Sequence, residues 1–289
     1  MAQSLPSTHI EAQVGNVSGG SQVAIGNYIV QIGHVEGGVV NILNNAPPPP
    51  KARPQPVSLR PKAFPGLLDR DKETTNIIEA LQVQQSVECT GEPGSGKTSL
   101  LRHLAHQSQL STIFQAGVVY FQVNQQSAPD LLKSLFDAFY TCDFPIKPSE
   151  TEIRFFLESV HALVLLDDVE ITAQQIETLM NVAPNCTFVV VTKERCLLGE
   201  TLEVPLKGLP TSDAVRLFQR ELRRTLSAEE QKGAQLICES VACIPLQVLR
   251  AAHKTREQNS SLLAVVSEGQ LATGDPRLVA AEVKSSSEN

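Results

Sequence analysis

The chain has 289 residues, which is enough for one large domain or for a domain with appendages. A hydrophobic content of 42% against 19% charged residues is typical of chains that fold. The formal net charge of −7 disfavours general nucleic-acid binding, because phosphate backbones attract proteins with excess cations. No apolar run reaches the roughly 18 residues of a membrane span, and the first residues lack the features of a secretory leader. We therefore expect a cytoplasmic protein that contacts neither nucleic acid nor membrane.

The first 46 residues differ in composition from the rest of the chain. They contain no Lys or Arg, and residues 15–27 (GNVSGGSQVAIGN) align with residues 33–45 (GHVEGGVVNILNN) at an offset of 18 residues. Each copy places a short β-prone run beside glycines, and neither supplies enough apolar surface to fold alone. We interpret residues 1–46 as a β-prone assembly motif, with a small folded β module and a passive tail as the alternatives.

A proline-rich stretch follows this motif. Eight of the 18 prolines fall between residues 47 and 65. Such a composition favours extended backbone without hydrogen bonds, so residues 47–63 are predicted to form a semi-rigid linker.

From Phe64 onward, short β-branched runs alternate with helical segments, which predicts an α/β fold. Apolar runs such as LVLL (163–166) are typical of parallel strands covered on both faces. The predicted strands are 86–90, 117–123, 162–167, 186–192 and 202–206, and the predicted helices are 71–83, 97–108, 129–140, 151–159, 172–180, 211–224 and 227–253. We expect a five-stranded parallel sheet flanked by helices over residues 64–207, a small helical subdomain over 208–255, and a polar tail or truncated continuation over 256–289.

The six cysteines are scattered without a C-x-x-C pair, and four of them lie in or beside apolar runs. This distribution favours buried, reduced thiols over a metal site or a disulfide framework.

The segment GEPGSGKT, Gly91 to Thr98, matches the phosphate-binding pattern G-x-x-x-x-G-K-[ST] between a predicted strand and a predicted helix. Its glycines let backbone amides point at phosphate oxygens, and the new helix adds its positive N-terminal end. Lys97 would reach the β and γ phosphates and take part in catalysis, and Thr98 would bind Mg²⁺. A glycine-rich structural turn is the alternative. The candidate ATP- and ADP-binding residues of this segment are Gly91, Glu92, Pro93, Gly94, Ser95, Gly96, Lys97, Thr98 and Ser99.

Two carboxylates, Asp167 and Asp168, end the apolar strand ALVLLD. Open α/β sheets bind their ligands at the carboxyl ends of the strands. Asp167 would hold Mg²⁺ through water, and Asp168 would orient or deprotonate the attacking water as the catalytic base. Two acids at a strand end also occur as a solvated turn, which is the alternative interpretation.

Several segments in a fixed order resemble the NB-ARC branch of the STAND nucleotide-binding proteins. They are FPGLLDR (64–70), GEPGSGKTSLLRHLA (91–105), LVLLDDV (163–169), FVVVTKER (188–195), LKGLPTSDAVRLF (206–218) and ACIPLQVL (242–249). The resemblance covers residues 64–253 and implies a signalling ATPase that rests with ADP, exchanges it for ATP and then forms a homo-oligomer. Proteins of this family continue into a winged-helix domain and a sensor array, so the chain is either an N-terminal fragment or borrows its sensor from another chain.

The resemblance also implies contacts to the nucleotide base. Phe64, Pro65 and Arg70 would lie on the adenine side, and Pro245 would lie against the base from the helical subdomain. Phe64 and Pro65 could instead close the linker, and Pro245 could be only the first residue of a helix.

The sensor of the γ-phosphate is less regular. In the family it is an Arg just after a Thr at the end of the fourth strand, whereas here Thr192 is followed by Lys193, Glu194 and Arg195. Lys193 or Arg195 would substitute for the family arginine, and a surface charge cluster is the alternative.

The N-terminal segment NYIVQIGHV (27–35) contains a V-Q-I-G core that resembles RIP-homotypic-interaction-like and bacterial amyloid signalling motifs. Such motifs copy their fold onto an effector protein that bears a matching N-terminal motif. A short, uncharged, β-branched segment with Asn and Gln is also the pattern of cross-β assemblies.

Together these features predict a slow ATPase used as a regulatory switch, which clusters its N-terminal motifs when ATP binds, in defence or cell-death signalling. Two other classes stay open: an AAA-like ATPase whose turnover performs work, and a self-assembling scaffold with a structural nucleotide. A switch hydrolyses slowly and retains its nucleotide, whereas a motor cycles continuously.

Overall fold

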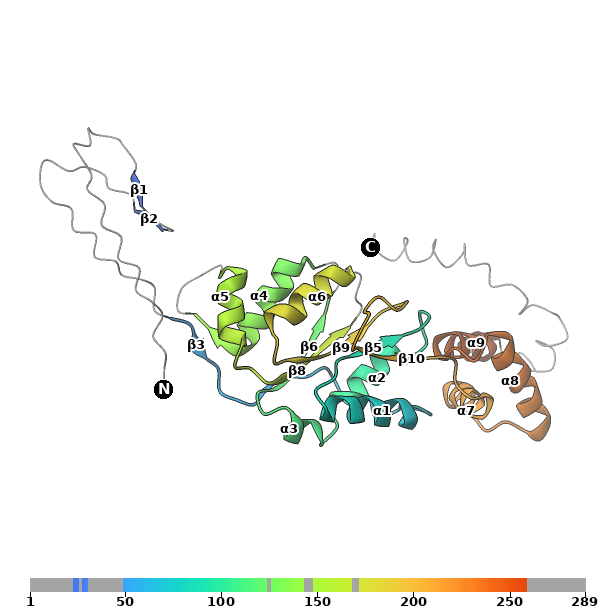
Figure 1. Cartoon of the computed structure of the whole chain (residues 1–289). Helices are drawn as coiled ribbons and strands as arrows, with labels where there is room; N and C mark the ends of the chain where they lie inside the picture. Colours follow the sequence, from blue (N-terminus) through green and yellow to red (C-terminus); the bar gives the residue numbers. More distant parts are fainter. Residues whose placement is uncertain are drawn as a thin grey trace, which may run out of the picture. The chain divides into compact units, whose positions relative to one another are not determined.

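The computed structural model describes residues 23–25, 28–30, 49–123, 126–142, 148–167 and 172–258, and divides into two compact units, Met1–Pro48 and Pro49–Asn289 (Figure 1). In the first unit the described residues are β1 (Val23–Ile25) and β2 (Tyr28–Val30), an antiparallel pair in which Val23 lies opposite Val30. Both strands belong to the predicted assembly motif. Most of that motif, including all of its second copy at 33–45, lies outside the described residues.

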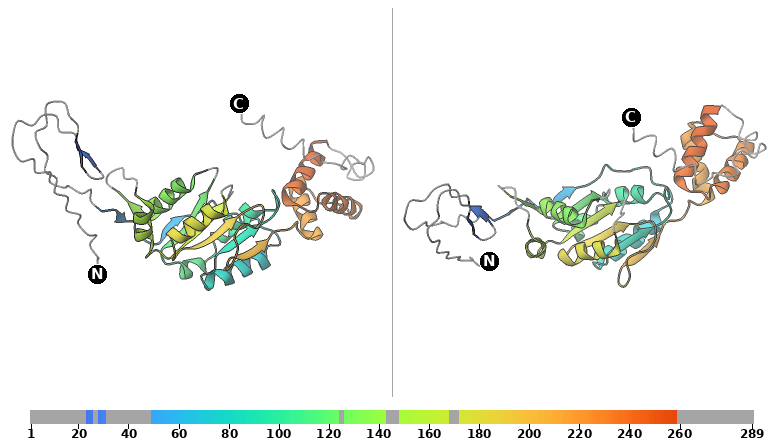
Figure 2. Two further views of the ribbon diagram at one scale, coloured as in Figure 1. Left: turned by 45° about the horizontal axis from the view of Figure 1, so that its top comes forward. Right: turned by 90° about the horizontal axis from the view of Figure 1, so that it is seen from above.

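A parallel β-sheet forms the centre of the second unit, as the sequence predicts. Its order within the described part of the chain is β10-β5-β9-β8-β6-β4. The strands are β4 (Val57–Leu59), β5 (Val87–Thr90), β6 (Gly117–Gln122), β8 (Ala162–Asp167), β9 (Thr187–Val191) and β10 (Leu202–Pro205). Helices cover the sheet on both faces (Figures 1 and 2), so the predicted α/β fold with a C-terminal helical part is confirmed.

The central strand β8 shows why this sequence forms a covered sheet. All six of its residues are buried. Val164 and Leu166 contribute to the core on one face, whereas Leu163 and Leu165 contribute to the core on the other, because successive side chains of a strand point to opposite faces. The first core is completed by α4 (Ala128–Phe139), α5 (Glu150–Leu157) and α6 (Ala173–Val182), and the second by α1 (Asp71–Gln82), α2 (Lys97–Leu104) and α3 (Leu110–Ile113).

The structure corrects the predicted linker over residues 47–63. Lys51–Ala52 form β3, which pairs antiparallel with β7 (Tyr140–Thr141), and β4 adds a sixth strand to the sheet beside β6. The Arg53 N–H donates to the Phe139 carbonyl at 2.7 Å, and the Val57 N–H to the Ala116 carbonyl at 2.8 Å. Pro54 and Pro56 fall between β3 and β4, so their missing N–H groups interrupt no ladder, and β4 is an edge strand. The proline content therefore did not prevent this segment from joining the domain.

The helical subdomain consists of α7 (Thr211–Leu222), α8 (Ala228–Ser240) and α9 (Pro245–Gln258) around a core of its own. The sequence predicted one helix over residues 227–253, but the helix breaks after Ser240. Ala242 and Cys243 adopt left-handed backbone angles, with φ of 52° and 53°, and the Cys243 N–H donates to the Cys238 carbonyl at 2.8 Å. Pro245 then starts α9, where its fixed φ and missing N–H are tolerated. None of the helices that the structure describes has the length and hydrophobicity that a membrane crossing needs.

Candidate nucleotide-binding site

The loop between β5 and α2 has the backbone of an anion cradle. Gly94 and Gly96 adopt φ of 87° and 98°, a region that other residues rarely occupy. Gly96 is the N-cap of α2, no side chain caps this helix, and its first turn carries no acid. The positive N-terminal end of α2 thus favours a negatively charged ligand. The Ser95 hydroxyl is buried without a hydrogen-bond partner among the described residues, as expected of a loop shaped to surround phosphate oxygens.

Lys97, the first residue of α2, folds back over this loop. Its Nζ donates to the carbonyl oxygens of Gly91 and of Glu92, the latter at 3.1 Å. The ammonium group therefore lies beside the glycine-rich backbone, which is where the sequence predicted a contact with the phosphates.

Three oxygen-bearing side chains meet at the end of β8. The Thr98 hydroxyl donates to Asp167 Oδ1 at 3.0 Å, and the Tyr120 hydroxyl donates to Asp167 Oδ2 at 2.7 Å. Asp167 is only 1% exposed. Burial, and then the hydrogen bond to Asp167, raise the pKa of Tyr120 to about 12, so this phenol stays a donor at neutral pH. Carboxylate and hydroxyl oxygens are ligands that Mg²⁺ accepts, so the residues present fit a magnesium ion.

The sequence anticipated only two members of this set. Thr98 and Asp167 were predicted to share a metal ion, and the fold brings them together. Tyr120 was missed, because a tyrosine in the run GVVYFQ reads as a core residue. The register of β6 and β8 would have indicated Tyr120. It pairs Tyr120 with Leu165, which lies two residues before Asp167 on β8. Asp168, the predicted catalytic base, lies outside the described residues.

Arg70 connects the loop to the segment after β10. It is 5% exposed, and its Nη2 donates to the carbonyls of Ser95 at 3.2 Å and Lys207 at 2.5 Å. Its Nη1 forms an ion pair with Glu73 at 2.9 Å. Through these three charge-assisted bonds Arg70 holds together the P-loop, the segment after β10 and the start of α1 at the edge of the site.

The helical subdomain reaches the same loop through the start of α9. The Leu246 N–H donates to the Gly94 carbonyl at 3.1 Å, and a side chain at Gly94 would lie 2.6 Å from Leu246 Cβ. A Cβ at Gly96 would be 4.0 Å from the Pro245 ring. Of the residues predicted on the adenine side, Arg70 and Pro245 thus lie at the loop. Phe64 is half-buried and Pro65 exposed in the segment that leads to Arg70.

The segment after β9 holds the candidate phosphate sensor. The Gly91 N–H donates to the Lys193 carbonyl at 3.2 Å, which places this segment beside the entry of the glycine-rich loop. A cavity of about 470 Å³ is bordered by Gly91, Ser95, Lys193, Glu194 and Arg195, by the segment after β10 and by the start of the helical subdomain. Thr192 is not among the described residues that border this cavity, and its hydroxyl donates to the buried Glu88 carboxylate at 2.8 Å.

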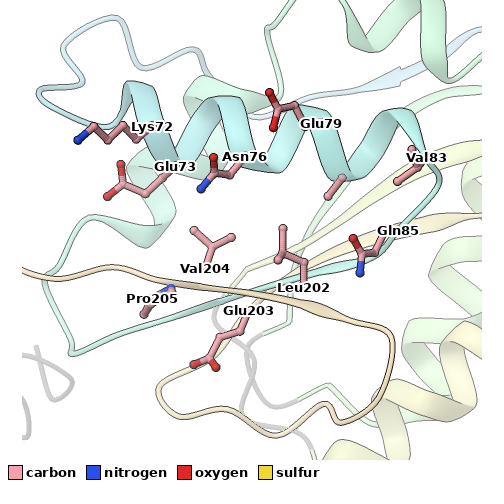
Figure 3. A pocket seen from close by; sticks show the side chains of 11 residues that line it. Lys72, Glu73, Asn76, Glu79, Val83, Gln85, Leu202, Glu203, Val204 and Pro205 are labelled. Atoms are coloured by element: carbon pink, nitrogen blue, oxygen red, sulfur yellow. The ribbon is translucent and has the colours of Figure 1, made fainter.

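A larger cavity, of about 590 Å³, lies between α1 and the edge strand β10. Figure 3 shows Asn76 of α1 pointing toward this strand, whereas Glu203 points away from the helix. Glu73 is paired with Arg70, and Glu203 with Arg195 at 3.3 Å. The cavity is away from the glycine-rich loop, so we do not assign the nucleotide to it.

A glycine-rich loop of this geometry, at the carboxyl end of a central parallel strand, is the common feature of P-loop NTPases, and this protein is one. Residues 85–225 match the sequence model of the NACHT domain. This stretch of the chain is therefore similar to a NACHT domain, and it spans β5 to the end of α7. The sequence predicted a resemblance to the NB-ARC branch, whereas the family model that matches is that of the NACHT domain.

Solved structures with a similar fold are remote in sequence. A Walker-type ATPase of Pyrococcus abyssi is 16% identical over 78% of each chain, with a TM-score of 0.49. The structure of Drosophila ORC bound to DNA is 16% identical, over 75% of this chain and 64% of that one, with a TM-score of 0.50. A STAND protein with a tetratricopeptide-repeat sensor from Pyrococcus horikoshii is 19% identical, over 66% of this chain and 30% of that one, with a TM-score of 0.44. A comparison with curated proteins finds no match.

Proposed function

We propose that the protein is a switch that rests with ADP and forms a homo-oligomer when ATP and Mg²⁺ are bound. The observation that carries this proposal is the contact between the P-loop and the helical subdomain, in which the Leu246 N–H donates to the Gly94 carbonyl. The phosphates and this bond use the backbone of the same loop, so nucleotide binding and the position of the subdomain would be energetically coupled.

Each residue of the site has a role in this proposal. The amides at the start of α2 and the Lys97 ammonium bind the phosphates, while Thr98 and Asp167 hold Mg²⁺, which supplies positive charge against the terminal phosphates. Asp168 orients or deprotonates the attacking water. Hydrolysis is slow, because the reaction resets a switch and does not drive continuous work.

The output of the switch is assigned to the N-terminal motif. Clustering of several copies raises the local concentration of residues 15–45, so that a segment too weak to nucleate alone can start a cross-β stack. An effector with a matching motif would join that stack, in defence or cell-death signalling. The support for this step is the repeated, β-prone sequence itself, which contains no Lys or Arg and has Glu36 as its one acidic residue.

The mass of the protein in each nucleotide state tests the switch. With ADP we expect the monomer, and with Mg²⁺ and a non-hydrolysable ATP analogue we expect a closed oligomer, measured by light scattering after size-exclusion chromatography. Asp168→Ala should oligomerise with ATP itself, because binding is kept while hydrolysis is lost. One and the same mass with ADP and with the analogue would contradict a switch and favour the scaffold alternative.

Removal of the Tyr120 hydroxyl should weaken Mg²⁺ binding. We expect Tyr120→Phe to lower the Mg²⁺ affinity of the ATP-bound protein by about 10-fold, because a carboxylate loses its orientation when its hydrogen-bond partner is removed. Affinity for ATP without Mg²⁺ should stay unchanged, as titration calorimetry in EDTA would show. Tyr140→Phe is the matched control, since the Tyr140 hydroxyl donates to the Phe156 carbonyl at 2.7 Å in the core. If Tyr120→Phe and Tyr140→Phe had the same Mg²⁺ affinity, Tyr120 would have no role in the Mg²⁺ site.

A further inference from the structure

A glutamate occupies the middle of the strand that leads into the P-loop. Glu88 lies on β5 between Val87 and Cys89, and its side chain is 0% exposed. The central strands of a parallel sheet are normally apolar, and a buried carboxylate is costly unless its oxygens are hydrogen-bonded. Sequences break this rule mainly where function requires it.

Among the described residues, the side-chain hydrogen bonds that Glu88 accepts come from one short segment, residues 192–197. The Thr192 hydroxyl donates to Oε1 at 2.8 Å, and the Leu197 N–H to Oε2 at 2.9 Å. Cys196 donates twice to Oε1, through its N–H at 2.9 Å and its thiol at 3.1 Å. Burial, together with the Glu88 carboxylate, raises the pKa of Cys196 to about 12, so the thiol remains a donor at neutral pH.

The segment held in this way contains the candidate phosphate sensor. Thr192 at one end and Cys196 and Leu197 at the other are bonded to Glu88, whereas Lys193, Glu194 and Arg195 between them border the cavity beside the P-loop. A backbone hydrogen bond also joins this segment to β5, because the Thr192 N–H donates to the Cys89 carbonyl at 3.0 Å. Glu88 therefore sets the distance between the phosphate cradle and these two cations.

We propose that Glu88 is a positioning residue for nucleotide discrimination, which holds residues 192–197 so that Lys193 and Arg195 face the terminal phosphate of ATP. Glu88 itself touches no ligand. This positioning role of Glu88 rests on the proposed nucleotide binding. It explains how the site would distinguish ATP from ADP, because only ATP has the terminal phosphate that Lys193 and Arg195 would contact.

The test is the ratio of the affinities for ADP and for a non-hydrolysable ATP analogue, measured by calorimetry. Glu88→Gln keeps the shape of the side chain but turns an NH₂ group toward donors, which displaces the segment. We expect affinity for the ATP analogue to fall at least 5-fold relative to ADP, while ADP affinity stays within 2-fold of that of the unmodified protein. In a Lys193→Ala, Arg195→Ala background, the addition of Glu88→Gln should not change the ratio further, because the cations through which it acts are gone.

A milder pair of variants keeps the test valid if Glu88→Gln does not fold. Thr192→Val removes one donor to Glu88 and should shift the ratio in the same direction, about 2-fold. Thr187→Val is the same chemical change at the other end of β9, where the hydroxyl donates to Gln84 at 3.0 Å, and should leave the ratio unchanged. An unchanged ratio in both Glu88→Gln and Thr192→Val would overturn the positioning role while leaving nucleotide binding intact. Failure of the unmodified protein to bind either nucleotide would overturn both proposals.

Discussion

Replacement of Lys97 by alanine should remove most of the nucleotide affinity. A cation that makes charge-assisted hydrogen bonds to two phosphates contributes about 3 kcal/mol, so the dissociation constant for ATP should rise about 100-fold, and that for ADP, which lacks the γ phosphate, should rise less. The structure places the Lys97 ammonium against the carbonyls of Gly91 and Glu92, where it can transfer to a ligand held by the same loop. Titration calorimetry with each nucleotide and Mg²⁺ measures the change.

Lys133→Ala is the matched control for this variant. Lys133 is half-exposed on α4 and pairs with Asp137 one turn away, so its loss should alter affinity less than 2-fold. Unaltered nucleotide affinity in Lys97→Ala, with a folded protein by circular dichroism, would show that the ligand does not bind at the P-loop.

Gly117→Ala should strongly destabilise the second unit. Gly117 begins β6 with φ of 114°, and a Cβ there would lie 2.0 Å from the Val57 carbonyl oxygen and 2.6 Å from the Val57 nitrogen. The backbone strain costs about 1–3 kcal/mol, and displacement of β4 adds the loss of its hydrogen bonds to β6. We expect the free energy of unfolding to fall by about 3 kcal/mol or more, measured by urea denaturation.

Gly199→Ala separates the two causes of the expected destabilisation, which are the backbone strain and the displacement of β4. Gly199 also has a positive φ, of 86°, but none of the described residues comes within 4 Å of the position that a Cβ would take, so only the backbone strain remains. Hydrogen exchange should accelerate at the β4 amides in Gly117→Ala and not in Gly199→Ala. Equal losses of stability in the two variants would mean that β4 contributes nothing to the fold.

The sequence predicts well those features that are local. The strand predicted at 162–167 coincides with β8. A short, uninterrupted apolar run bounded by polar residues is typical of a buried strand, so this element could be predicted from its own residues. The P-loop was found from residue spacing and from the strand and helix expected around it, since its chemistry requires glycines, a lysine and a hydroxyl at fixed positions. Helix α8 likewise begins at a capping box, formed by Ser227 and Glu230, that sequence spacing specifies.

Features that depend on pairing between distant strands were not predicted. Tyr120 and Glu88 gain their contacts from residues 47 and at least 104 positions away, respectively, so no local pattern distinguishes them from other strand residues. The edge strand β4 was missed for a related reason. Composition indicated a linker around Pro54 and Pro56, whereas hydrogen bonds to β6 decided its structure. The break before Pro245 did have a local signal, because proline is favoured at the first position of a helix.

The pairing of Lys51 with Thr141 changes how far the N-terminal motif can reach. Six Cα steps separate Asn45, the end of the second repeat, from Lys51, which allows at most about 20 Å at 3.3–3.6 Å per residue. A free linker over 47–63 would have allowed roughly three times as much. In the proposed oligomer, the Asn45 ends of the second repeats of two subunits can therefore meet only when their Lys51 residues come within about 40 Å of each other. The packing of subunits in the oligomer, and not the length of a flexible tether, would decide which motifs stack first.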